Sequence, residues 1–86
     1  MKVKEGYILR TIAGVNVVIP YGDEMDLNVM LTLNDTGKFL WEQLQTEKTK
    51  DQLLEAVLNN YETDRDEATA YISTFIQKLV EYECLE

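Results

Sequence analysis

Histidine is absent from this chain of 86 residues, and serine, cysteine and proline occur once each. Without histidine, nucleophilic catalysis by a Ser–His or Cys–His pair is excluded within the chain. Ser73 lies inside an expected helix, and it lacks the Asp-Ser-Leu setting in which a carrier protein bears a phosphopantetheine arm. Cys84 has no partner for an internal disulfide, so we expect it to pack near the end of the chain. This composition predicts a protein that is not an enzyme.

Motifs for metals and phosphates are missing as well. No C-x-x-C or H-E-x-x-H pattern occurs, and the four glycines are too scattered to cradle a phosphate. Asp23, Glu24 and Asp26 lack the order of a calcium loop and its distal glutamate, so a solvated loop is the favoured interpretation. A second acidic group could mimic the acid/base pair of an enzyme: Glu62, Asp64, Asp66 and Glu67. Helix capping and the helix dipole account for it, and we expect neither a metal nor another cofactor.

Positive charge is scarce. The formal net charge is −8 and the isoelectric point is near 4.4, which argues against nucleic acid and anionic membranes as partners. The charge fits a basic or apolar partner, or solubility alone. No apolar run is long enough to span a bilayer, and residues 1–6 contain no apolar core of a signal peptide. We therefore expect a cytoplasmic protein.

What the chain does contain is a globular composition with a clear strand pattern at its start. Its hydrophobic fraction is 45%, and its length suits one domain over residues 1–86. Tyr7–Ile12 and Val15–Ile19 are rich in β-branched and aromatic residues, with Ala13-Gly14 as a tight turn between them. Pro20 ends the second strand or lies at its edge. After a polar loop, Val29–Leu33 predicts a third, short strand.

At Asn34 the pattern changes from strand-like to helix-like. Asn34 is a favoured N-cap residue, and Asp35 suits the positive end of the helix dipole. The apolar spacing that follows predicts a helix from Asp35 to about Gln45. Aromatic residues at helical spacing are usually core, so we assign Phe39 and Trp41 to the core rather than to a ligand site.

Two more helices are expected in the second half of the chain. Thr49 and Gln52 form a T-x-x-Q capping box, and the apolar residues that follow it share one face: Leu53, Leu54, Val57, Leu58 and Tyr61. The third helix begins at Asp64, extends toward Tyr82 and carries a broad apolar stripe: Ala68, Tyr71, Ile72, Phe75, Ile76 and Leu79. Tyr71 lies on the flank of this stripe, where it serves either the core edge or a ligand. Together the elements predict an α+β fold, a winged helix-turn-helix-like domain with a three-stranded antiparallel sheet followed by three helices.

The order of these pieces resembles the PqqD family. The resemblance is carried by “YILRTIAGVNVVIPY”, “LTLNDTGKFLWEQLQ”, “TKDQLLEAVLNNYE” and “TDRDEATAYISTFIQKLVEYECLE”. Its most specific part is the step Leu33-Asn34-x-Thr36-Gly37, followed by Trp41. The family contains the pyrroloquinoline quinone (PQQ) biosynthesis protein D and its relatives, which are recognition elements for ribosomally made, post-translationally modified peptides (RiPPs).

The resemblance implies a peptide-binding function. In that family the third strand is an exposed edge, and the leader segment of a precursor peptide adds to it as an extra strand against the last helix. The family member then delivers the peptide to a modifying enzyme, often a radical S-adenosylmethionine (radical SAM) enzyme. The matching residues of this chain are Met30, Leu31, Thr32, Leu33, Ala68, Tyr71, Ile72 and Phe75. The loop Gly22–Asn28 indicates no subgroup, so the precursor stays open.

Two other functions compete with this interpretation. A winged helix could bind DNA, but the helices that would meet the phosphates carry more acids than bases. A small assembly domain could instead use the same edge strand to dimerise, because unpaired edges invite pairing. Monomer and weak homodimer therefore both remain open, and a titration with a candidate leader peptide would separate the last two functions.

Overall fold

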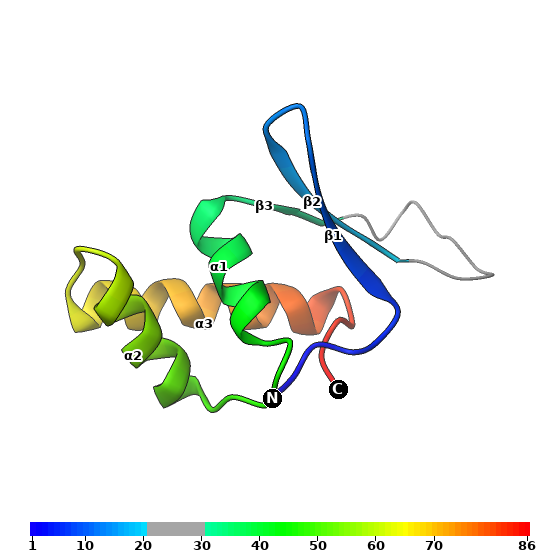
Figure 1. Cartoon of the computed structure of the whole chain (residues 1–86). Coiled ribbons are helices and arrows are strands. Elements are labelled where there is room, and N and C mark those ends of the chain that lie inside the picture. The colour runs from blue at the N-terminus through cyan, green and yellow to red at the C-terminus, as the bar shows by residue number, and fades with distance from the viewer. Residues whose placement is uncertain (21–30) are drawn as a thin grey trace.

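The computed structural model describes residues 1–20 and 31–86, and within them a small sheet precedes a set of helices (Figure 1). The strands are β1 Tyr7–Ile12, β2 Val15–Pro20 and β3 Leu31–Leu33. The helices are α1 Asp35–Gln43, α2 Lys50–Asn60 and α3 Arg65–Glu81. This order confirms the predicted α+β fold.

The sheet is antiparallel throughout, with the strand order β1-β2-β3. Ala13 and Gly14 both have positive φ angles, 52° and 79°, as the tightest two-residue hairpin turns require. The predicted third strand is present as Leu31–Leu33. Its first two predicted residues, Val29 and Met30, lie outside the described residues, as does the acidic group Asp23, Glu24 and Asp26.

The three predicted helix caps are confirmed. Asn34 Oδ1 accepts a hydrogen bond from the Gly37 amide at 2.8 Å, and Asp64 Oδ1 accepts one from the Glu67 amide at 2.7 Å. The capping box at the start of α2 is reciprocal, with distances of 3.1 and 2.8 Å between its backbone and side-chain partners. Each cap satisfies amides that have no partner within their own helix. Local sequence therefore decides where all three helices begin.

The predicted helix ends are less accurate than the starts. Helix α1 ends at Gln43, two residues before the expected Gln45. Helix α3 ends at Glu81, and Tyr82 is its C-cap. The residue after that cap, Glu83, has a positive φ of 57°. This left-handed turn sends the chain back along the N-terminal segment.

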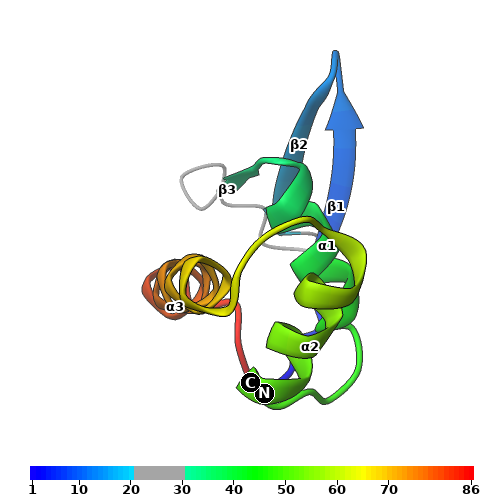
Figure 2. The same cartoon turned by 90° about the vertical axis from the view of Figure 1, so that its left-hand side faces the viewer.

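The hydrophobic core lies between the sheet, α1 and the two later helices (Figures 1 and 2). Trp41 is 2% exposed, and the Tyr7 ring meets it edge to face at 6.4 Å between centroids. Its assignment to the core is confirmed. Phe39 is only partly buried and packs against the core. Its ring meets the Tyr61 ring edge to face, with 5.4 Å between the ring centroids.

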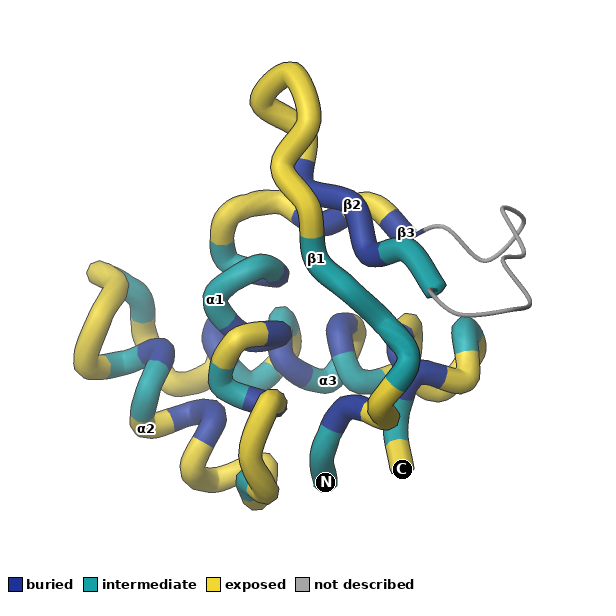
Figure 3. The backbone as a smooth tube through the Cα atoms, turned by 45° about the vertical axis from the view of Figure 1, so that its right-hand side comes forward, coloured by how far each residue is buried: buried dark blue, intermediate teal, exposed yellow. Residues whose placement is uncertain are grey.

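The two ends of the chain lie side by side and close the bottom of the core (Figures 1 and 2). Val3 bridges Leu85, and the Lys4 amide donates to the Cys84 carbonyl at 2.8 Å. Cys84 is fully buried, as expected of a packing residue, and burial raises the pKa of its thiol. The tip of the β1–β2 hairpin, by contrast, projects away from the body and is exposed (Figure 3).

Candidate functional site

The pairing of the hairpin determines which backbone groups of β2 face β3. Ile12 and Val15 flank the two-residue turn, so they exchange both of their backbone hydrogen bonds. Hydrogen-bonded and non-hydrogen-bonded pairs alternate along an antiparallel ladder. Val17 therefore bonds to β1, whereas the amides and carbonyls of Asn16 and Val18 point the other way, toward β3.

The same alternation extends to β3. Leu31 lies opposite Val18 and Leu33 lies opposite Asn16, so these two leucines bond to β2. Thr32, between them, directs its amide and carbonyl to the opposite side of the strand. Since β3 is the last strand of the described sheet, that side is a free edge. The register thus assigns the open hydrogen-bonding positions on β3 to the Thr32 backbone.

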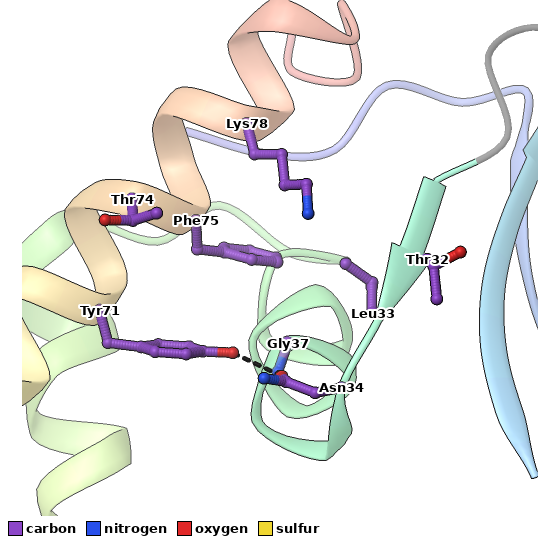
Figure 4. A pocket seen from close by; sticks show the side chains of 8 residues that line it. All are labelled: Thr32, Leu33, Asn34, Gly37, Tyr71, Thr74, Phe75 and Lys78. Carbon is purple, nitrogen blue, oxygen red and sulfur yellow. Dashed lines mark hydrogen bonds between the residues drawn. The ribbon is translucent and has the colours of Figure 1, made fainter.

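A hollow of about 170 Å³ lies along this edge, between β3, the start of α1 and the side of α3 (Figure 4). We call it the β3–α3 groove. Its lining residues are Thr32, Leu33, Asn34, Gly37, Tyr71, Thr74, Phe75 and Lys78. Leu33 and Phe75, at 6% and 5% exposure, form an apolar floor, and the exposed Thr74 and Lys78 stand at its margin. The groove therefore combines a free strand edge with an apolar floor.

One hydrogen bond crosses the groove. The Tyr71 hydroxyl donates to Asn34 Oδ1 at 2.5 Å, and the same oxygen accepts the Gly37 amide that it caps (Figure 4). A tyrosine hydroxyl is protonated at neutral pH, and burial raises the pKa of Tyr71 further, so this hydroxyl can donate. From the sequence, Tyr71 could belong either to the edge of the core or to a ligand site. In the structure it is partly buried and lines the groove.

Gly37 permits the close approach of β3 and α1 at this point. A Cβ at position 37 would lie 3.2 Å from Asn34 Oδ1 and 3.3 Å from the Leu33 Cβ. Such contacts are tight, and they would push the cap away from the helix start. The step from Leu33 to Gly37, singled out in the sequence, is thus the corner where the strand edge, the cap and the groove meet.

A second hollow of about 230 Å³ lies beyond Tyr71, at the start of α3. It is lined by Thr36, Val57, Tyr61, Glu62, Thr63, Glu67, Ala68 and Tyr71. We call it the acidic hollow because its two charged lining residues, Glu62 and Glu67, are carboxylates. Tyr71 belongs to both hollows and separates them.

The structure brings together half of the predicted site residues. Thr32, Leu33, Tyr71 and Phe75 line the β3–α3 groove, and Ala68 lines the acidic hollow. The side chains of two others are core: Leu31 is 1% exposed, and Ile72 is fully buried on the side of α3 that faces α2. Met30 lies outside the described residues.

Four lining residues were missed by the sequence reasoning: Asn34, Gly37, Thr74 and Lys78. The sequence pattern assigns Asn34 and Gly37 only to the helix start. Thr74 and Lys78 follow Tyr71 at a spacing of three and seven residues, so they share its face of the helix. That spacing could have identified them once Tyr71 was considered as a ligand contact.

Removing the Asn34 side chain should destabilise the domain measurably. Asn34→Ala loses the N-cap and the Tyr71 contact, and loss of an N-cap alone costs about 1 kcal/mol. Asn34→Asp keeps an oxygen at the cap and should remain close to the parent. Urea unfolding of both variants measures the difference. Equal stability of Asn34→Ala and the parent would show that this cap does not hold α1.

Neither a membrane helix nor a metal cluster is found in the described part of the chain. Across residues 1–20 and 31–86, no helix combines the length and apolarity that crossing a bilayer requires. The same residues contain no group of three or more histidine, cysteine, aspartate or glutamate side chains placed to hold a metal ion. The acids at the start of α3 are accounted for in part by the Asp64 cap.

Comparison with known proteins gives one family and one similar structure. Residues 7–85 match the family described as “Coenzyme PQQ synthesis protein D (PqqD)”. A solved structure described as “TbiB1 in Complex with the TbiA(beta) Leader Peptide” superposes with a TM-score of 0.78 at 21% sequence identity. The superposition covers 100% of this chain and 95% of that one, so the whole fold is shared. No curated protein sequence matches the chain.

Proposed function

We propose that this chain, which belongs to the PqqD family, is a binding module for the leader segment of a ribosomally made precursor peptide. The observation that carries the proposal is the free edge of β3 beside the wall of α3. An extended peptide can add to such an edge as a further strand. Backbone hydrogen bonds then provide affinity, and the pockets beside the strand provide specificity.

The peptide would lie in the β3–α3 groove. The Thr32 amide and carbonyl would bond to the peptide backbone, because the register directs them to the free edge. Leu33 and Phe75 would contact its apolar side chains. Tyr71 is a further contact, and its protonated hydroxyl could exchange Asn34 for a peptide carbonyl.

Three of the residues that the family resemblance assigns to peptide binding do not line the β3–α3 groove. Leu31 and Ile72 support the groove from the core, since their side chains are buried. Ala68 lies beyond Tyr71, so only a peptide that continues past this residue would reach it. The similar structure is a complex of TbiB1 with a leader peptide, and this complex supports peptide binding for the shared fold.

We further propose that the bound leader is presented to a modifying enzyme, with a radical SAM enzyme as the first candidate, and that the chain does not catalyse the modification itself. A pull-down with this chain as bait should recover the small precursor peptide and the enzyme encoded beside it. Recovery of the enzyme without the precursor, from cells that make both, would contradict leader capture.

Hydrogen exchange of the labelled protein tests the binding mode. Without peptide, the Thr32 amide should exchange fast, and the Leu31 and Leu33 amides should be protected by their bonds to β2. A saturating leader peptide should slow exchange at Thr32, while a scrambled peptide of the same composition should not. Unchanged exchange at Thr32 with a peptide that binds tightly would contradict strand addition. A helix-only binding mode would then replace it.

A further inference from the structure

Strand addition by itself does not fix the register of a bound peptide. Backbone groups repeat along a strand, so a peptide shifted by two residues meets the same donors and acceptors. Backbone pairing alone therefore discriminates poorly between such registers. A side chain of the groove that recognises one position of the leader would fix the register.

Lys78 has the geometry and the charge for this recognition. Among the described residues that line the β3–α3 groove, it is the charged one. Figure 4 shows its side chain extending from α3 into the space between α3 and β3. The ion pairs formed between described residues, Met1–Glu47 and Arg65–Glu55, do not involve it. The Lys78 amine is thus placed to meet the side chain of a bound peptide.

The other end of the same face carries the opposite charge. Glu62 and Glu67 line the acidic hollow, which adjoins the groove at Tyr71. Along α3, Glu67 and Lys78 are about 16 Å apart at ~1.5 Å per residue, which corresponds to roughly five residues of extended peptide. A peptide that follows α3 therefore passes from a positive to a negative environment within this length.

Resting on the proposed function, we propose that Lys78 pairs with an aspartate or glutamate of the leader and thereby fixes the register of the added strand. The acidic hollow disfavours a second acid about five residues away along the extended peptide. The ligand class is therefore a leader with an acidic residue at one defined position, followed or preceded by a neutral or basic segment. Whether the acidic residue comes before or after the neutral or basic segment in the leader sequence shows in which direction the added strand runs.

A displayed library of short random peptides tests this assignment without knowledge of the natural precursor. Peptides selected by the parent protein should share aspartate or glutamate at one position. Lys78→Glu should shift that position toward lysine or arginine, and Lys78→Gln should lose the preference. Lys48→Glu is the matched control, because it makes the same change of charge on the connection between α1 and α2, outside the groove, and should select the parental peptides.

One synthetic peptide from the parental selection then gives the size of the effect. Replacing its conserved acid with the corresponding amide should weaken binding roughly two- to fivefold, the range of an ion pair near the surface. The loss should grow at low salt and should disappear in Lys78→Gln. Circular dichroism of each variant checks that its fold is intact, as expected for an exposed residue.

The outcomes separate this inference from the proposed function. Enriched peptides without an acidic preference, or a preference that Lys78→Glu leaves unchanged, would overturn the role of Lys78 while peptide binding stands. Failure of the parent protein to enrich any peptide would contradict the proposed function and this inference with it. If Lys48→Glu altered the peptide preference as strongly as Lys78→Glu, the effect would be one of general charge. That result would also overturn the role of Lys78.

Discussion

Thr32→Pro should leave the fold nearly intact and weaken leader binding about tenfold or more. Proline removes an amide hydrogen and is tolerated in a sheet mainly where that hydrogen faces outward. The register places the Thr32 amide on the free edge of β3 and its side chain is exposed, so the domain loses little. The incoming strand loses one backbone bond, worth about 0.5–1.5 kcal/mol, and meets the proline ring as well.

Leu31→Pro should have the opposite outcome. The Leu31 amide faces Val18 in the ladder, and its side chain is 1% exposed in the core. The substitution removes a bond within the sheet and a buried leucine together, and loss of the buried side chain alone costs about 2–5 kcal/mol. Circular dichroism and thermal unfolding should show a damaged fold.

Thr32→Ala is the control that separates the amide from the side chain. Alanine keeps the amide hydrogen, so this variant should bind a leader nearly as well as the parent, by calorimetric titration. If Thr32→Pro kept its melting curve and bound as tightly as Thr32→Ala, the peptide would not use the edge of β3. A site formed by α3 alone would then explain binding better.

Trp41→Ala should destabilise the domain by roughly 3–5 kcal/mol, the usual range for removing a large buried aromatic residue. Trp41 is 2% exposed, and the Tyr7 ring packs against it. A small domain has a total stability of only about 5–15 kcal/mol, so this loss removes a large fraction of it. At about 4–8 °C per kcal/mol for domains of this size, the melting temperature should fall by roughly 12–40 °C.

Thermal unfolding followed by circular dichroism measures this change, with Trp41→Phe as the control. Phenylalanine keeps an aromatic ring in the same space and should restore a large part of the stability. Phe39→Ala offers a second comparison, because Phe39 is only partly buried and should cost less. An unchanged melting temperature for Trp41→Ala would mean that Trp41 contributes nothing to the core, against its burial.

Local features of the sequence determined most of the fold. The caps at Asn34, Thr49 and Asp64 are interactions between near neighbours in the chain, so their residue types were enough to place the helix starts. The turn at Ala13-Gly14 is local in the same sense. Helix ends were predicted less well: α1 stops at Gln43, two residues before the expected end, and no strong stop signal such as glycine or proline marks that position.

The candidate site depended on both levels. The resemblance to a family pointed to β3 and α3, and Thr32, Leu33, Tyr71 and Phe75 do meet in one groove. The sequence could not say which side of β3 is free, because the parity follows from a register that begins at the hairpin turn. It also could not separate Ile72, on the core side of α3, from Phe75 in the groove, because both belong to one continuous apolar stripe.

By itself, then, the sequence determined the element order, the helix starts, the core position of Trp41 and the family, since each depends on short-range pattern or composition. Only the tertiary structure decided which backbone groups of β3 are free and which side chains lie next to one another. Lys78 is the clearest case. In the sequence it is one cation in the last turn of a helix, where it suits the helix dipole. It becomes a groove residue only because α3 packs beside the edge of β3, which brings residues 32 and 78 to one cavity.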